Sequence, residues 1–530
     1  MTVGNNMEKY LFELIQVAIG NRSALSSVPT QPEWQRLYGF MSKHTLIGIG
    51  YVAIQKLPKE QWPPKMLVLK WTSVANGIKN QNMALNEECR SICEEFTHDG
   101  VESVVIKGQS NLEYYPEALR EYRTPGDIDL WCQARNGVEI GEMVNGEVVK
   151  SEYHGIEGVI EYCKQYERNR GRNIPWHRVL YYHCELKSDN GIAIEPHYRI
   201  SYLHSPIRNY RLQQWFDKQF DVCIHNKCLI GFPVLTSSVN VVYQLVHLYR
   251  HIFENGIGLR QLMDYYFALK VWYNDVMESK DLQSQGMWSE GLGTPVMSAT
   301  EIMAVLRTFG MGKFAAAVMW VINEVFVGEH ENENSERQQE QHKTTLCPQA
   351  DGGGEQLLIN DERLMINDCV HTDETDRTDK SPQADYKGRQ QEQLKTTFCP
   401  QADGGGEHEL SRIDRELKEN NYVPWMICEP NEKEGQLLIN DERLRVNDYP
   451  WLLCEPNGKE GKKLLAEIMQ GGNFGQYDTR DAGLKKGGMM KHGVWKLKRV
   501  MRLVSSYPEE ALWEPVFRVW HLVWRGINGG

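Results

Sequence analysis

The sequence lacks the features that mark exported, membrane-spanning or zinc-binding proteins. Its 12 cysteines form no C-x-x-C pair and no Cys/His quartet at zinc spacing, so we expect reduced thiols. Its most apolar windows, residues 45–54 and 314–327, are far shorter than the roughly 20 residues that cross a bilayer. Residues 1–16 are acidic and amphipathic, whereas a secretory signal has a basic segment followed by an apolar run. These absences predict a cytoplasmic protein without a membrane span.

Excess positive charge is also missing. The 530 residues include 59 lysines and arginines against 71 aspartates and glutamates, a formal net charge of −12. No global positive field is therefore available to hold a polyanion, which argues against long duplex nucleic acid as a partner. The chain contains no G-x-S-x-G motif, which argues against an ordinary metal-independent hydrolase. With 530 residues and a hydrophobic content of 41%, the chain is globular in composition and long enough for two to four domains with their own cores.

Hydrophobic periodicity divides the chain into five regions. Residues 1–99 place apolar residues at three- and four-residue intervals and predict a helical N-terminal region. Residues 100–236 contain β-branched and alternating runs and predict a small α/β core. Helical periodicity returns over residues 237–330 and again over the C-terminal region, residues 449–530. Between these two helical regions, residues 331–448 have a different character.

Residues 331–448 repeat themselves. The stretch RQQEQHKTTLCPQADGGGE at 337–355 returns almost unchanged at 389–407, and QLLINDERLMIND at 356–368 returns at 436–448. The copies are nested and mostly polar, whereas solenoid repeats have one fixed period and an apolar face in each unit. This pattern predicts a duplicated, low-complexity insertion that is largely disordered.

We expect deletion of roughly residues 336–448 to leave the folded core stable, because the segment is polar and the closure entropy of a long loop grows slowly with its length. The shortened chain should express at least as well as the full chain, and limited proteolysis of the full chain should cut this segment first. Thermal melts of both chains provide the comparison. A protease-resistant segment whose removal unfolds the flanking helices would show that the repeats pack into the core.

The last stretch of the chain carries an aromatic stripe. Trp513, Phe517, Trp520 and Trp524 stand three and four residues apart, which is the spacing of one helical face. This pattern predicts a helix that docks on the core, and a membrane-surface helix is the alternative.

Two short runs and one hairpin predict the strands of the α/β core. VESVVIKG (101–108) is β-branched and ends in a glycine, and in DIDLWCQ (127–133) apolar residues alternate with aspartates. Residues 179–187 and 192–200 flank the sequence Ser-Asp-Asn-Gly, and an Asn-Gly of this kind is a strong hairpin signal. Helical stretches are expected at 156–168 and between the first two strands.

Asp127 and Asp129 are the leading candidates for a catalytic metal site. Residues i and i+2 of a strand point to the same face, about 6.5–7 Å apart at their Cα atoms, so both carboxylates can reach one ion. Hard oxygen ligands of this kind suit Mg²⁺ (or Mn²⁺) bound to a triphosphate. The preceding strand ends in Lys107 and Gly108, where a flexible glycine and the free N–H groups of a helix start can receive phosphate.

Glu195 is the candidate for a third carboxylate, which would complete a two-metal site for in-line phosphoryl transfer. In IAIEPHYRI the apolar residues alternate with Glu195, His197 and Arg199, so these three share one strand face. That face can approach the cleft of Asp127 and Asp129, and a solvated hairpin face is the alternative. His197 would then act as a proton shuttle or as a group that supports Glu195.

Five other polar residues are further candidates. Arg123, just before the D-x-D strand, can contact a phosphate or form a salt bridge to a neighbouring helix. Arg260 and Asp264 fit an i,i+4 ion pair, which either lines the acceptor side of the cleft or is structural. His247 and His251 have zinc-like spacing but lack the glutamate of H-E-x-x-H and a third ligand, so core or surface histidines are expected.

The order of the motifs resembles that of a known family. A strand followed by Lys-Gly and a helix, then R-x-x-G-D-I-D-L, then E-x-H-x-R resembles the uncharacterised nucleotidyltransferase family of bacterial genomes, a branch of the polymerase-beta-like nucleotidyltransferase superfamily. The similarity extends to GIGLRQLMDYYFAL (256–269). The resemblance implies an α+β fold, in which a small mixed sheet is flanked by helical regions. It also implies Asp127 and Asp129 as metal ligands and Glu195 as the third acidic residue.

The triphosphate-binding segment departs from the superfamily pattern. Where the superfamily has Gly-Ser, this chain has Lys107, Gly108, Gln109 and Ser110. Either the charge of Lys107 or the hydroxyl of Ser110 can replace the serine of the pattern, and both possibilities stay open.

The sequence thus predicts a metal-dependent nucleotidyltransferase. It would move a nucleoside monophosphate from an NTP to an acceptor hydroxyl on a small molecule, a protein or an RNA, with release of pyrophosphate. The alternative is a non-catalytic nucleotide- or partner-binding protein on the same scaffold. A catalyst must bring the three carboxylates within a few ångströms of one metal position, whereas a binding protein need not.

Overall fold

The computed structural model describes residues 3–144, 147–284, 296–328, 453–473 and 489–528. The duplicated insertion predicted at 331–448 lies outside this part of the chain. All the elements described below belong to one compact unit.

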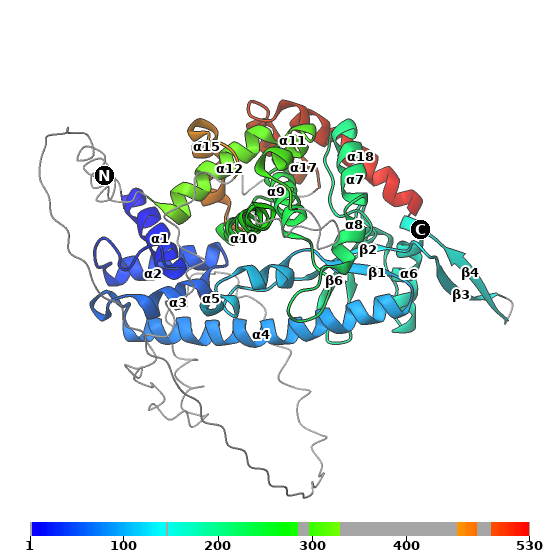
Figure 1. Ribbon diagram of the computed structural model, residues 1–530, viewed down its shortest axis with the longest axis horizontal. Helices are drawn as coiled ribbons and strands as arrows, with labels where there is room; N and C mark the ends of the chain where they lie inside the picture. The colour runs from blue at the N-terminus through cyan, green and yellow to red at the C-terminus, as the bar shows by residue number, and fades with distance from the viewer. Residues whose placement is uncertain (1–2, 145–146, 285–295, 329–452, 474–488, 529–530) are drawn as a thin grey trace, which may run out of the picture. The chain divides into compact units, whose positions relative to one another are not determined.

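The N-terminal region is helical, in agreement with its apolar periodicity. Its elements are α1 (Val3–Ile19), α2 (Gln31–Lys43), α3 (Ile47–Lys56), the 3₁₀ turn η1 (Lys59–Gln61) and α4 (Lys65–His98). In the 34-residue helix α4, buried residues from Trp71 to Phe96 recur at every third or fourth position. This stripe packs first on α3 and then on strand β1 of the sheet, so α4 runs along both the N-terminal helices and the α/β core (Figure 1).

A four-stranded sheet forms the centre of the α/β core. Its strands are β1 (Glu102–Val105), β2 (Ile128–Gln133), β5 (Leu186–Lys187) and β6 (Ala193–His197). The spatial order is β1-β2-β6-β5, in which β2 is antiparallel to β1 and parallel to β6, and β5 is antiparallel to β6. The predicted α+β fold with a small mixed sheet and helical flanks is therefore confirmed.

The connection from β1 to β2 is less regular than the predicted helix. It consists of the 3₁₀ helix η2 (Gly108–Tyr114) and a single α-helical turn, α5 (Glu117–Arg120). Pro116 explains the break, because a proline disfavours the helical conformation in the residue before it. Tyr115 accordingly has an extended backbone, with φ −77° and ψ 144°.

The β5–β6 hairpin turns at residues 188–191, as its Asn-Gly signal predicts. Gly191 has a φ of +77°, in the left-handed region that glycine adopts without strain. The N–H of Ser188 donates to the carbonyl of Ile192 at 2.9 Å, which closes the turn. The strands are shorter than predicted, although isolated bridges extend the pairing to His183 and His197.

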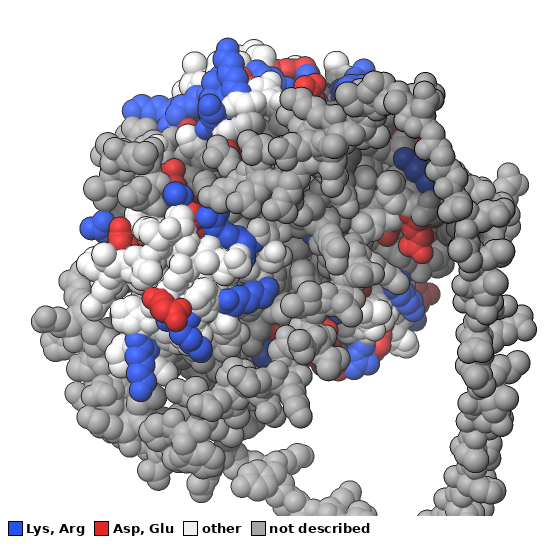
Figure 2. All heavy atoms as spheres, turned by 60° about the vertical axis from the view of Figure 1, so that its left-hand side comes forward, with Lys and Arg blue, Asp and Glu red and all other residues white. Residues whose placement is uncertain are grey.

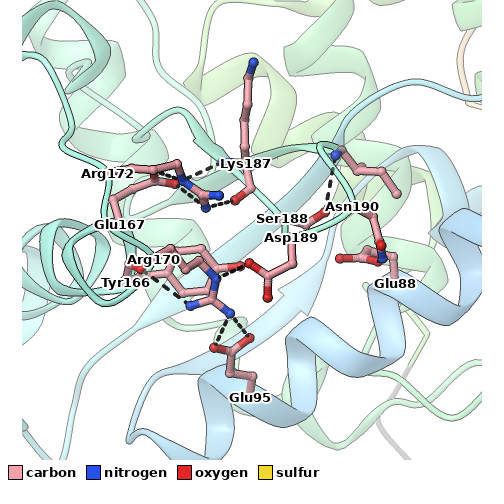
Figure 3. A network of polar contacts seen from close by, with 11 residues as sticks. Glu88, Glu95, Tyr166, Glu167, Arg170, Arg172, Lys187, Ser188, Asp189 and Asn190 are labelled. Atoms are coloured by element: carbon pink, nitrogen blue, oxygen red, sulfur yellow. Dashed lines mark hydrogen bonds and ion pairs between the residues drawn. The ribbon is translucent and has the colours of Figure 1, made fainter. Parts of the chain in front are cut away.

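Ion pairs and hydrogen bonds tie this hairpin turn to two helices (Figure 3). Arg170 follows α6 (Gly155–Asn169) and donates to Asp189 of the turn at 2.9 Å and to Glu95 of α4 at 2.8 Å. Asn190 of the turn donates to Glu88, also on α4, at 2.7 Å. These contacts fix the position of the strand that follows the turn, β6.

A second, two-stranded sheet was absent from the predicted elements. It is the antiparallel pair β3 (Val138–Val144) and β4 (Glu147–Tyr153). Three short helices in the same region also went unpredicted, namely η3 (Trp176–Arg178), α7 (Pro206–Asp217) and α8 (Phe220–His225).

Helices return after residue 236, as predicted. They are α9 (Ser237–Glu254), α10 (Leu259–Ser284), α11 (Ala299–Thr308), α12 (Gly312–Ile322), the π-helical turn η4 (Asn323–Val327), α15 (Gly458–Gly471), α17 (Met489–Leu503) and α18 (Pro508–Asn528). Every residue of α9 from Ser238 to Phe253 is buried, so this helix lies inside the unit. Among the described helices, none is long and apolar enough to cross a membrane.

The aromatic stripe of α18 docks on the core, which agrees with the predicted docking helix. Phe517 stacks on Tyr202 with a ring centroid distance of 4.7 Å, and Tyr181 packs against Trp520 at 4.9 Å and Trp524 at 5.8 Å. The opposite side of α18 is exposed and apolar, and it includes Leu512, Val516, Val519 and Val523.

Candidate active site

Three carboxylates meet at the ends of two neighbouring strands. The register between β2 and β6 places Asp129 opposite Glu195, and Asp127 immediately precedes the first residue of β2. Carboxylate oxygens of all three residues lie within 4.8 Å of one another. The structure therefore brings together the three acidic residues selected from the sequence, in a group of hard oxygen donors that suits a divalent cation.

Lys107 reaches this carboxylate cluster from the end of β1. Its ammonium nitrogen lies 2.9 Å from Oδ1 of Asp129, a fully buried side chain. The next residue, Gly108, has a φ of +67°, which favours glycine, and a Cβ there would meet the carbonyl oxygen of Asp127 at 3.5 Å. Glycine thus lets the chain turn sharply into η2 beside the aspartates.

Burial and mutual repulsion change the proton affinities in the cluster. Burial, together with the charge of Asp127, raises the pKa of Asp129 to about 7. Burial alone would lower the pKa of Lys107, but Asp127, Asp129 and Glu195 raise it well above its ordinary value. Lys107 therefore stays charged, while one carboxyl group of the metal-free cluster holds a proton near neutral pH.

The raised pKa of Asp129 predicts a pH-dependent stability for the metal-free protein. A carboxyl group whose folded pKa is raised stabilises the fold below its unfolded pKa, and this contribution is lost as the pH rises through about 7. Asp129→Asn removes the ionisation, so in EDTA at about pH 8 we expect the variant to melt higher than the wild type by up to about 2–4 °C. Near pH 5 the difference should shrink. An equal difference at both pH values in thermal melts would contradict the assignment.

Asp127 and Asp129 of the cluster line a cavity together with residues of helices α9 and α10. Its lining residues are Lys107, Gly108, Asn111, Arg123, Gly126, Asp127 and Asp129 from the α/β core, Tyr243, Gln244, His247 and Leu248 from α9, and Arg260, Gln261 and Asp264 from α10. Ser110, the other candidate for phosphate binding, is buried and is absent from this lining. Asn111, which sequence reasoning missed, lines the cavity in its place, and its Oδ1 accepts a hydrogen bond from the Gln244 amide at 3.2 Å.

Arg123 forms a buried ion pair, the second of its two predicted roles. Its Nε and Nη2 donate to the two carboxylate oxygens of Asp264 at 2.7 Å each, and the hydroxyl of Tyr115 donates to Oδ1 of Asp264 at 2.6 Å. The predicted i,i+4 pair between Arg260 and Asp264 was wrong. Arg260 instead donates to the carbonyl of Thr124 at 2.8 Å, because the carboxylate of Asp264 points to the segment before β2.

The prediction that Glu195, His197 and Arg199 share one strand face holds for Glu195 and His197 but not for Arg199. His197 faces the cluster, with Nε2 3.1 Å from Oδ1 of Asp129 and 3.5 Å from Oε2 of Glu195. Burial lowers the pKa of His197, but its hydrogen bonds to these two carboxylates raise it above its ordinary value overall. Arg199 lies beyond the last residue of β6 and instead packs its guanidinium over the ring of Tyr181 at 4.2 Å.

Three other histidines complete the surroundings of the cluster. His247 and His251 are buried on α9 with their ring centroids 4.3 Å apart, in agreement with the prediction of core histidines. His183 was not selected from the sequence. Its Nε2 lies 3.9 Å from Oε1 of Glu195, and burial holds its pKa well below the ordinary value.

A family comparison agrees with this geometry. Residues 30–285 match the model of a family described as uncharacterised nucleotidyltransferase. This part of the chain belongs to that nucleotidyltransferase family. The matched range contains the three carboxylates, Lys107 and all of α10. No curated protein and no solved structure matches the chain.

Proposed function

We propose that the protein is a metal-dependent nucleotidyltransferase that moves a nucleoside monophosphate from an NTP to an acceptor hydroxyl and releases pyrophosphate. The observation that carries this proposal is the convergence of Asp127, Asp129 and Glu195, whose carboxylate oxygens lie within 4.8 Å of one another beside a cavity. Membership of residues 30–285 in a nucleotidyltransferase family supports the reaction class.

Asp127, Asp129 and Glu195 are suitable ligands for Mg²⁺ or Mn²⁺. All three side chains offer carboxylate oxygens, the ligands that both ions prefer. Oδ2 of Asp129 is buried and has no hydrogen-bond partner among the described residues, which is costly for a carboxylate unless a cation compensates it. A bound cation would stabilise the charge that develops on the transferred phosphoryl group and would assist ionisation of the acceptor hydroxyl.

Lys107 is proposed as the residue that binds the triphosphate. It lines the cavity and stays charged, and its ammonium can move from Asp129 to a phosphate oxygen when a nucleotide enters. This assignment favours Lys107 over Ser110, because the serine does not line the cavity. His197, in contact with both Asp129 and Glu195, would hold the two carboxylates in the orientation that a cation requires.

The acceptor is proposed to enter from the side of α9 and α10, whose residues supply the other part of the cavity lining. The geometry leaves a small molecule, a protein and an RNA as possible classes. Among the described residues on the face shown in Figure 2, basic side chains lie between acidic and uncharged ones and do not form one continuous patch. That distribution gives no support to long duplex nucleic acid as a partner.

A cytoplasmic location remains part of the proposal, since the eight cysteines of the described residues are free thiols.

The proposal is tested by incubating the full chain with Mg²⁺ and each NTP in turn, in the presence of a cell extract, and recording the mass of every modified species. We expect one species to gain the mass of a nucleoside monophosphate, and pyrophosphate to appear in equal amount. Nucleotide binding without any such product would favour the non-catalytic alternative. The absence of both binding and product would reject the nucleotide site altogether.

A further inference from the structure

Glu195 also belongs to a second group of potential metal ligands. His183 and His197 face each other across the β5–β6 hairpin, where an isolated bridge pairs their backbones. Their ring centroids are 4.9 Å apart, with an interplanar angle of 36°. Ligand atoms of His183, Glu195 and His197 all lie within 4.8 Å of one another. This His–Glu–His group shares only Glu195 with the three-carboxylate cluster.

The separations in the group resemble those around a single bound ion. Two ligand atoms bonded to one ion at about 2.1 Å are about 3.4 Å apart at the tetrahedral angle. Nε2 of His197 lies 3.5 Å from Oε2 of Glu195, and Nε2 of His183 lies 3.9 Å from Oε1 of the same carboxylate. Small side-chain rotations are therefore sufficient to bring the three donors onto one ion.

His183 supplies an independent observation. Its side chain is 3% exposed, and neither ring nitrogen makes a hydrogen bond within the described residues. A buried imidazole normally has a hydrogen-bond partner for at least one nitrogen, because its removal from water is otherwise uncompensated. The ring of Tyr182, the preceding residue, packs edge-on against the imidazole, with the ring centroids 4.1 Å apart. This contact holds the His183 ring in place but gives its nitrogens no hydrogen bond.

The donor types distinguish this group from the carboxylate cluster. Imidazole nitrogens suit Zn²⁺, Co²⁺ and related transition metals, whereas Mg²⁺ selects oxygen ligands. Charge also allows a cation here. Glu195 brings a carboxylate into this buried group, and a second carboxylate oxygen, Oδ1 of Asp129, lies 3.1 Å from Nε2 of His197.

We propose that His183, His197 and Glu195 form a transition-metal site that is distinct from the proposed magnesium site and shares Glu195 with it. The inference does not depend on nucleotidyl transfer, because its donors and their geometry stand without the reaction. In this site Nε2 of His197 binds the ion in place of its contact with Asp129. If both sites are occupied, Glu195 bridges them, so the transition metal replaces His197 as the group that positions Glu195 for the catalytic cation.

Cobalt titration of the full chain tests this proposal. Co²⁺ bound by imidazole nitrogens in a site of four or five ligands gives an intense visible absorption, whereas Co²⁺ in an all-oxygen octahedral site absorbs weakly. We expect the wild type to show the intense band with one equivalent of Co²⁺, and we expect excess Mg²⁺ not to abolish it. His183→Gln should weaken Co²⁺ binding at least about 10–100-fold. Removal of a side chain that only hydrogen-bonds to a metal ligand already causes a loss of this size.

Asp127→Asn is the matched control, since Asp127 belongs to the carboxylate cluster but not to the His–Glu–His group. It should keep the Co²⁺ band. Circular dichroism checks that both variants are folded. Pulsed EPR of the wild type with one equivalent of Cu²⁺, in which ¹⁴N coupling reports a directly bound imidazole, needs no variant. An absent Co²⁺ band, an unchanged band in His183→Gln, or bound Cu²⁺ without ¹⁴N coupling would each overturn the site. Magnesium-dependent transfer is assayed separately, so failure of this site and failure of the proposed reaction are distinguishable.

Discussion

Replacement of Asp127 or Asp129 by asparagine is expected to lower nucleotidyl transfer by at least about 10³-fold, because each change removes a charge that the proposed cation and the transferred phosphoryl group require. The side-chain volume is nearly unchanged, so the fold should remain intact. Steady-state kinetics with saturating Mg²⁺ give the measurement. The loss should appear mainly in kcat, since the missing charge acts most strongly where charge develops in the transition state.

Asp221→Asn is the matched control for these variants. It is the same chemical change on α8, where the carboxylate is 73% exposed and pairs with Arg135. Its kinetics should equal those of the wild type. Full activity in Asp127→Asn or Asp129→Asn would remove that residue from the catalytic site, and an equal loss in Asp221→Asn would show that the effect is not specific to the cluster.

The largest loss of stability is expected from Asp264→Asn. Asp264 accepts two hydrogen bonds from Arg123 and one from Tyr115, and the side chain of Arg123 is 3% exposed. Its replacement leaves the guanidinium of Arg123 buried without a counter-charge, close to that of Arg260. Breaking a buried ion pair from one side typically costs about 3–5 kcal/mol. We expect a decrease of this size in the free energy of unfolding measured with urea.

The same control applies here, because the Arg135–Asp221 pair is of the same chemical type but exposed. Asp221→Asn should change the free energy of unfolding by less than about 1 kcal/mol. A cost of less than about 1 kcal/mol for Asp264→Asn as well would show that Arg123 finds another partner or water, and that the pair does not hold the segment before β2 in place.

The carboxylate cluster could be predicted because its members lie on regular strands or, in the case of Asp127, directly before one. Alternation placed Glu195 on the polar face of its strand, and the D-x-D spacing placed Asp127 and Asp129 together. The Asn-Gly turn also fixes the hairpin register. Lys187 pairs with Ala193 and Leu186 with Ile194, so continued pairing puts His183 opposite His197. His183 could thus have been selected from the sequence had the register been followed four residues further.

Other features depend on the tertiary structure or on a signal that was overlooked. Arg123 and Asp264 are 141 residues apart, and no local pattern links the segment before β2 with α10. The i,i+4 spacing suggested Arg260 as the partner of Asp264, but a bidentate bond to Arg123 orients the carboxylate elsewhere. The β3–β4 hairpin was detectable, because residues 145–146 are Asn-Gly between two short segments that contain β-branched residues, VEIGEMV and EVVKSEY.

Paired labelling of the NTP tests the central claim most directly. The full chain is incubated with Mg²⁺, an acceptor-containing extract, and NTP that carries the label on either the α- or the γ-phosphate. The proposed reaction predicts that the α-label moves to an acceptor while the γ-label leaves in pyrophosphate, and that Asp127→Asn does neither. Transfer of the γ-label to an acceptor, release of the γ-label as inorganic phosphate, or α-label transfer that persists in Asp127→Asn would contradict nucleotidyl transfer at this cluster.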